Sequence, residues 1–263
     1  MMGNEQIRRD AMHQVSAGNL VTRIYPNRSL MGQDAADKVG EKINELLKQQ
    51  DFVNIIFASA PSQNEFLAAV SVKTAIDWSR VNAFHMDEYI ELPENDPRTF
   101  ASFLKEKIFD RLPFHSINYI NGNAPNIGAE CRRFAKLLVE YPPDIVCLGI
   151  GENGHLAFND PPVADFSDPL MVKMVKLDAA CRQQQVNDAC FAELSQVPAY
   201  AITLTIPALM AGKYVYCIVP GKKKAEAVYN TLNAEIVEKY PSTILRNHPS
   251  TVLFLDKDSI SLL

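Results

Sequence analysis

Helical and strand-like hydrophobic patterns alternate along this chain. Between residues 31 and 49, apolar side chains recur every three or four positions, which predicts a helix with one buried face. Short apolar runs such as 51–57 and 144–149 predict buried strands. The same criteria predict helices over 63–78, 99–109, 129–140 and 222–232, strands over 80–86, 116–120, 214–220 and 251–255, and extended segments over 169–177 and 199–206.

This order of elements predicts the fold class. Strands that alternate with helices indicate βαβ units, and therefore an α/β protein with a mostly parallel sheet in a three-layer α/β/α, Rossmann-like arrangement. The 263 residues contain no repeat and no long Gly/Ser linker, so we expect one domain over 1–263. Ligands of such sheets bind beyond the carboxyl ends of the strands. The polar residues that follow predicted strands are therefore the candidates for a site.

Two strand ends carry groups that suit an anion. After the strand at 51–57, Ser59 and Ser62 offer hydroxyls before a predicted helix, whose first N–H groups are free. A simple helix cap by Ser62 explains the same residues equally well. After the strand at 214–220, the run Lys222-Lys-Lys224 opens another helix, where a lysine favours a phosphate. A solvated basic turn is the alternative interpretation there.

A third strand end carries two adjacent carboxylates. Asp87 and Glu88 come directly after the apolar strand at 80–86. A partly buried carboxylate with a raised pKa can act as a general base. A solvated pair in a loop is the ordinary alternative for two such residues. From these two residues alone, the solvated pair is the more common of the two interpretations.

The fourth strand end, residues 149–162, is the most informative segment. Its glycines fit the G-x-G-x-x-G spacing of dinucleotide-binding turns, but two prolines at 161–162 prevent the long helix which that motif requires. A glycine-rich structural turn is a second alternative. His155 titrates closest to neutral pH, and Asp160 can hold its imidazole in one tautomer. Asn153 can position His155 or a substrate, but it cannot take a proton.

Composition and charge exclude several classes of protein. The net charge is −5 without a long basic block, which argues against a nucleic-acid partner. The apolar runs are shorter than the roughly 18 residues of a membrane span, and residues 1–9 lack the apolar core of a signal peptide. The five cysteines include no C-x-x-C pair, which indicates reduced thiols without a metal site. We therefore expect a cytoplasmic protein.

Four longer motifs, in order, make the chain resemble the glucosamine-6-phosphate deaminase (isomerase) family over most of its length. They are Met86-Asp-Glu-Tyr89 with Leu92-Pro93, Asn121-Gly-Asn-Ala-Pro125, Gly149-Ile-Gly-Glu-Asn-Gly-His-Leu-Ala-Phe-Asn159 and Gln196-Val-Pro-Ala-Tyr-Ala-Ile-Thr203. The resemblance implies a Rossmann-like fold and a reaction without metal or cofactor. An aminosugar phosphate opens its ring, isomerises through an enol and loses ammonia, which yields fructose 6-phosphate.

The resemblance also assigns roles to individual residues. Asp87 matches the base that moves a proton between C1 and C2, His155 the residue that assists ring opening, and Asp160 its carboxylate partner. Asn153 matches a position that carries Asp or Asn. Lys224 matches a phosphate-binding lysine, and the substrate-binding or phosphate-binding set is completed by Ser59, Ala60, Ser62, Glu88, Gly151 and Arg182. The expected partner is a small sugar phosphate, and a homo-oligomer is left open.

The chain departs from the family pattern at three places. Ala60 and Pro61 replace the paired glycines of the phosphate loop, and Pro61 has no N–H to donate. Asp160 stands where members usually carry Glu, and Arg182 is offset from the family's phosphate arginine. Two other functions are therefore weighed, a 6-phosphogluconolactonase-type hydrolase and a non-catalytic sugar-phosphate-binding protein. The first lacks support, because His155 is not followed by the Thr-Ala-Ser-Leu-Phe-Pro that is typical of lactonases.

Overall fold

The main sheet of the protein is mostly parallel, as the alternating pattern predicts. The computed structural model describes residues 13–93 and 95–263, so the expectation about residues 1–9 lies outside the described part. These residues form an eight-stranded sheet in which only β1 runs antiparallel to its neighbour. Its strands are, in spatial order, β1 (His13–Ala17), β2 (Leu20–Tyr25), β11 (Thr251–Asp256), β10 (Tyr214–Val219), β7 (Ile145–Leu148), β3 (Val53–Phe57), β4 (Val81–His85) and β6 (Ser116–Asn118).

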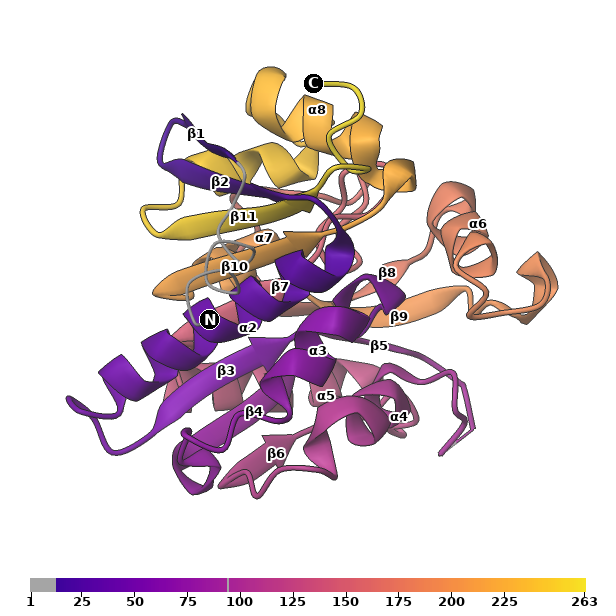
Figure 1. The fold of residues 1–263 in the computed structure, drawn as a ribbon. Coiled ribbons are helices and arrows are strands. Elements are labelled where there is room, and N and C mark those ends of the chain that lie inside the picture. Colours follow the sequence, from indigo (N-terminus) through magenta and orange to yellow (C-terminus); the bar gives the residue numbers. More distant parts are fainter. Residues whose placement is uncertain (1–12, 94) are drawn as a thin grey trace.

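Helices cover both faces of this sheet and complete three layers (Figure 1). One face packs against α2 (Arg28–Leu46), α3 (Asn64–Val70) and the end of α4 (Phe100–Leu104), which continues as a π-helical turn (Lys105–Phe109). The other face packs against α5 (Ile127–Glu140), α7 (Ile206–Met210) and α8 (Ala225–Asn233). Each face buries its own apolar cluster, which explains why the central strands are apolar on both sides. The predicted three-layer α/β class is confirmed.

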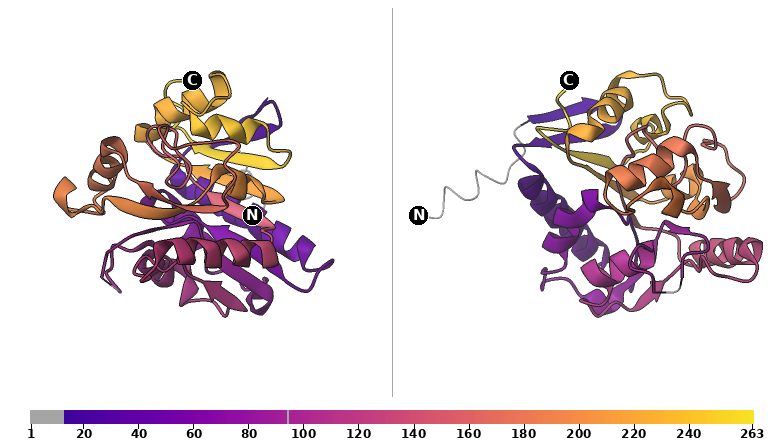
Figure 2. Two further views of the ribbon diagram at one scale, coloured as in Figure 1. Left: turned by 180° about the vertical axis from the view of Figure 1, so that it is seen from behind. Right: turned by 90° about the vertical axis from the view of Figure 1, so that its right-hand side faces the viewer.

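A second, antiparallel sheet lies beyond the main one and was not predicted. It consists of β5 (Asp87–Tyr89), β9 (Tyr200–Leu204) and β8 (Val172–Lys176). Together with α6 (Ala179–Asn187) it extends to one side of the molecule, as Figures 1 and 2 show. Its own small core contains Tyr89, Phe158 and Phe191. The extended segments expected over 169–177 and 199–206 correspond to β8 and β9, which pair with each other rather than with the main sheet.

Five elements, α3, β1, β2, α6 and α7, were predicted differently or missed. The helix expected over 63–78 is much shorter, because α3 ends at Val70 and the chain then turns to bury Ile76 and Trp78. Packing of these two side chains outweighs the local helical pattern. The β1–β2 hairpin was missed, because β2 alternates weakly between buried and half-buried positions. The helices α6 and α7 were missed as well, since α6 is rich in Gln and Asn and carries little apolar periodicity.

The sheet order decides where a site can form. Strands β10, β7, β3 and β4 are immediate neighbours and run parallel, so their carboxyl ends meet at one edge. These are the four strands whose ends carry the candidate polar residues. Among the described residues, no helix is both long and apolar enough to cross a membrane.

Candidate active site

A cavity of about 290 Å³ opens at the carboxyl ends of these four strands. All four segments that the sequence singles out contribute to its wall. Of the expected site residues, those that line the cavity are Ser59, Ala60, Ser62, Asp87, Gly151, His155 and Lys224. Four others do not line it, namely Asn153, Asp160, Glu88 and Arg182. The fold therefore brings most of the candidates to one cavity, and the other four side chains make contacts outside its wall.

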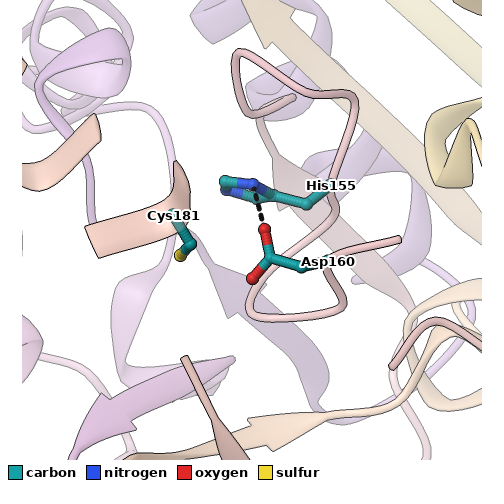
Figure 3. Close-up of side chains that lie close together, drawn as sticks. All are labelled: His155, Asp160 and Cys181. Carbon is teal, nitrogen blue, oxygen red and sulfur yellow. Dashed lines mark ion pairs between the residues drawn. The ribbon is translucent and has the colours of Figure 1, made fainter. Parts of the chain in front are cut away.

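His155 is held in one tautomer by two acceptors. Its Nδ1 lies 2.7 Å from Oδ1 of Asn153 and 3.1 Å from Oδ1 of Asp160, as Figure 3 shows for the second pair. Both of these oxygens only accept hydrogen bonds, so the proton of the neutral imidazole resides on Nδ1. Nε2 then carries the free lone pair, and it has no hydrogen-bond partner among the described residues. The ring lines the cavity, so Nε2 is available to a ligand.

The loop after β7 is shaped to place this ring. Gly151 must be glycine, because a Cβ there would overlap the imidazole of His155. Gly154 adopts φ +87°, a conformation that side chains rarely tolerate. Within the loop, the N–H of Gly151 donates to the carbonyl of His155 at 2.9 Å. The glycines of this segment therefore serve a tight turn that presents a histidine.

Strand β9 fixes the β7 loop and Asp87 relative to each other. The N–H of Phe158 donates to Oγ1 of Thr203 at 3.1 Å, and Nδ2 of Asn159 donates to the carbonyl of Leu204 at 2.8 Å. Thr203 is also the register partner of Asp87 in the antiparallel pair of β5 and β9. One strand thus holds both the histidine loop and the carboxylate strand, although these are far apart in the sequence.

Asp160 stays ionised despite its burial. Burial alone would raise the pKa of its carboxyl group, but the interactions with His155 and with Nδ2 of Asn153, which donates at 2.9 Å, bring that pKa below its ordinary value. The Cys181 thiol lies on the other side of the carboxylate (Figure 3). The shorter Asp side chain therefore reaches the imidazole, and a buried negative charge faces Nδ1.

The same neighbourhood contains the one group of potential metal ligands found among the described residues. His155, Asp160 and Cys181 offer ligand atoms within 4.8 Å of one another. Burial raises the pKa of the Cys181 thiol far above its ordinary value, which disfavours the thiolate that a metal requires. The hydrogen bonds of His155 already account for Nδ1. We therefore interpret these three residues as His155 with two side chains packed beside it, and not as a metal site.

Asp87 is the second functional group of the cavity. It is 7% exposed, and burial, reinforced by the negative charge of Glu88, raises the pKa of its carboxyl well above the ordinary value. No hydrogen bond to the Asp87 carboxylate is found among the described residues. A carboxylate that is buried, unpaired and in contact with a cavity is a strong base once it is ionised. This is the environment that a proton-abstracting residue needs.

Glu88 faces away from the cavity and caps a helix. Its carboxylate accepts from the N–H groups of Phe100 and Ala101 at 3.1 and 2.9 Å, at the beginning of α4. It also accepts from the N–H of Tyr89. Burial raises the pKa of Glu88 to about 7, while these backbone donors oppose the shift. The expected substrate-binding role is not supported by this position, because adjacent residues of a strand point to opposite faces.

The cationic part of the cavity is built from β10 and β3. Lys224 is 7% exposed, and burial lowers the pKa of its ammonium group. Its Nζ has no hydrogen-bond or ion-pair partner among the described residues. The loop after β3, residues 58–63, adds the hydroxyl of Ser59, which is buried without a partner, and that of Ser62. We call residues 58–63 the β3 loop; together with Lys224 it forms an environment suited to an anion.

Arg182 does not contribute to this environment. Its Nη2 donates to the backbone carbonyls of Leu194 and Val197 at 2.8 Å each, and it therefore fastens the segment after α6. Sequence reasoning also missed six cavity residues, namely Arg28, Phe100, Gln184, Gln185, Asp188 and Cys190. Arg28 begins α2 directly after β2, so it stands at the carboxyl end of a main-sheet strand that the sequence analysis did not predict. The other five belong to α4, α6 and the segment after α6, outside the main sheet.

Comparison with known proteins places this fold in a class. A solved structure of a monomeric glucosamine-6-phosphate deaminase, described as a missing link of the NagB superfamily, matches with a TM-score of 0.84 and 26% identity over 92% of this chain and 99% of that chain. A 6-phosphogluconolactonase from Thermotoga maritima matches with a TM-score of 0.74 and 19% identity over 90% and 100%. The class is therefore the α/β fold shared by these two groups of sugar-phosphate enzymes.

Sequence relatives narrow the class to a family. A Bacillus cereus (strain B4264) protein named glucosamine-6-phosphate deaminase is 35% identical over 230 residues, which cover 88% of this chain and 86% of that protein. A Bacillus thuringiensis (strain Al Hakam) protein of the same name is 34% identical over the same shares. Residues 26–254 match a family described as glucosamine-6-phosphate isomerases/6-phosphogluconolactonase. The chain belongs to this family, as the resemblance predicts.

Proposed function

We propose that this protein is a glucosamine-6-phosphate deaminase, which converts glucosamine 6-phosphate and water to fructose 6-phosphate and ammonia. The observation that carries the proposal is the buried, unpaired Asp87 in one cavity with His155. Lys224 lines the same cavity and suits the phosphate. The activity named for the relatives supports the same reaction.

His155 acts in ring opening. Its free Nε2 accepts the proton of the anomeric hydroxyl, the C1–O5 bond breaks, and the proton passes to O5, which leaves an aldehyde at C1. Asp160 and Asn153 keep the proton on Nδ1 throughout the neutral state. The negative charge of Asp160 also stabilises the imidazolium that forms while the ring carries both protons.

Asp87 acts in the isomerisation. Its carboxylate removes the proton from C2 of the open aldehyde while O1 takes up a proton from the substrate's own ammonium group, which gives an enol with the neutral amine still attached to C2. Return of the proton to C1 moves the double bond to the C2–N bond, and the resulting iminium reacts with water to release ammonia and the ketone. A buried carboxylate with a raised pKa suits this transfer, because it takes a proton readily and returns it to the neighbouring carbon.

Release of ammonia from glucosamine 6-phosphate tests the proposal. The purified protein should release ammonia from this ester, and unphosphorylated glucosamine should react far more slowly because Lys224 has no anion to hold. 6-Phosphogluconolactone serves as the second substrate, since lactonases share the fold. Hydrolysis of that lactone without ammonia release, or binding of the amino sugar phosphate without turnover, would contradict the proposed reaction.

A further inference from the structure

Arg28 reaches from the first turn of α2 to the β3 loop. Its Nη2 donates to the carbonyl of Pro61 at 3.0 Å and to Oε2 of Glu65 at 2.8 Å, while its Nε lies 2.5 Å from Oε1 of Glu65. Arg28 also lines the cavity, as do Pro61 and Ser62. Its guanidinium is therefore held at the edge of the anion-binding part of the site by one carboxylate.

The negative charge of a phosphate ester exceeds the single positive charge of Lys224. Such a group carries about −1.5 to −2 charges near neutral pH, whereas the buried Lys224 supplies one positive charge. Lys223 donates to the carbonyl of Asn187 at 2.8 Å and lies 3.8 Å from Asp188, so it already has partners. Arg182 is bound to backbone carbonyls. Lys222 also lines the cavity, and Arg28 is the one arginine among the described residues that do so.

The backbone of the β3 loop offers one N–H donor fewer to a phosphate because it contains Pro61. A loop that binds phosphate usually offers several N–H groups, and proline removes one of these donors. Pro61 stands in the middle of this loop, and its carbonyl is the group that Arg28 touches. The Nη and Nε donors of an arginine next to Pro61 can replace the missing N–H with a charged, two-pronged donor.

We propose that Arg28 binds the phosphate of the substrate together with Lys224 and Ser59, and that Glu65 is its counter-ion while the site is empty. The inference rests on the proposed function, because it takes a sugar phosphate as the ligand. On binding, the guanidinium exchanges one or both contacts with Glu65 for phosphate oxygens. The side chains of Arg28 and Glu65 are 44% and 29% exposed, so water screens the pair and can solvate Glu65 after the exchange.

Equilibrium binding of glucitol 6-phosphate tests this proposal without any turnover, because that open-chain ester has neither a carbonyl group nor an amine. Calorimetric titration would compare the unchanged protein with Arg28→Ala, Arg28→Lys, Glu65→Gln and the double variant. Lys38→Ala is the matched control, since Lys38 pairs with Glu41 on the exposed side of the same helix. Thermal unfolding of each variant reports on stability separately.

We expect Arg28→Ala to weaken binding about tenfold or more and Arg28→Lys to weaken it less, since lysine keeps the charge but not the fork. Glu65→Gln should tighten binding several-fold by removing the competing carboxylate, and this gain should vanish when Arg28 is also Ala. Equal affinity of Arg28→Ala and Lys38→Ala would overturn the proposal. So would a loss of melting temperature shared by Arg28→Ala and Glu65→Gln without any change in affinity, which would make the pair a structural link only.

The two proposals fail in different ways. Binding of glucitol 6-phosphate that depends on Arg28, in a protein that releases no ammonia from glucosamine 6-phosphate, would retain the phosphate site and refute the reaction. Normal ammonia release with no dependence of affinity on Arg28 would retain the reaction and refute the role of Arg28.

Discussion

Nδ1 of His155 lies 3.1 Å from Oδ1 of Asp160, and both side chains are almost fully buried. Because the carboxylate can only accept, this contact fixes which ring nitrogen carries the proton. The family resemblance places Glu at this position, yet the loop after β7 brings the shorter side chain within reach. In the proposed mechanism, Asp160 therefore acts through His155 as a positioning residue.

Replacing Asp160 with Asn should therefore reduce kcat by roughly 100- to 10,000-fold, because the amide can donate to Nδ1 and favour the other tautomer. Asp160→Glu keeps the carboxylate and should retain more activity than Asp160→Asn, although the extra methylene must fit beside Cys181. Steady-state kinetics with glucosamine 6-phosphate would measure both. Equal activity of the two variants would show that the charge facing Nδ1 has no role.

Asp87→Asn should lower kcat by about 100- to 10,000-fold, since the amide cannot accept the C2 proton. In the unchanged protein, kcat/KM should rise with pH as Asp87 loses its proton, and the raised pKa moves that rise above the ordinary carboxyl range. Ammonia release measured across pH would show it. A variant that retains full activity would remove Asp87 from the mechanism.

The same substitution should stabilise the fold at high pH. A carboxyl whose pKa is raised in the folded state favours folding below its unfolded pKa, and that contribution is lost as pH rises through the folded pKa. Asp87→Asn stays neutral, so its free energy of unfolding should exceed that of the unchanged protein at pH 8. The difference should shrink as pH falls towards about 4. Denaturant unfolding at several pH values measures it.

Glu88 should influence the reaction only through the pKa of Asp87. Glu88→Gln removes the negative charge that helps to raise this pKa, so the acidic limb of kcat/KM should move to lower pH. KM for glucosamine 6-phosphate should stay within about twofold, because Glu88 caps α4 and does not line the cavity. A large rise in KM together with an unchanged pH profile would instead support the substrate-binding role that the sequence suggested for Glu88.

Gly151→Ala should inactivate the protein without unfolding it. The added methyl group overlaps the imidazole of His155 and forces the ring to move, and a displacement of about 1 Å can cost about 100-fold in rate. Gly128→Ala is the control, since its Cβ would meet nothing closer than 3.4 Å on the surface of α5. Kinetics and circular dichroism of both variants would separate a misplaced ring from a lost fold.

The order of elements along the chain is enough to predict the layered fold and the convergence of three candidate residues. Alternating periodicities define a parallel sheet, and the carboxyl ends of parallel strands meet at one edge, so Asp87, His155 and Lys224 could be expected to converge. This inference needs only the order of strands along the chain. The family motifs around Asp87 and His155 then supply the chemistry that the position alone leaves open.

Other features of the cavity depend on contacts between residues that are distant in the sequence. Glu88 adjoins Asp87, yet the pairing of β5 with β9 turns the two side chains to opposite faces, and local sequence does not reveal that pairing. Arg182 has the residue type of a phosphate ligand, but two backbone carbonyls occupy it. Arg28 begins α2 after β2, a strand that the sequence analysis did not predict, and it reaches the cavity where α2 packs beside α3. Long-range packing sets these contacts, and the chain's local pattern carries no information about it.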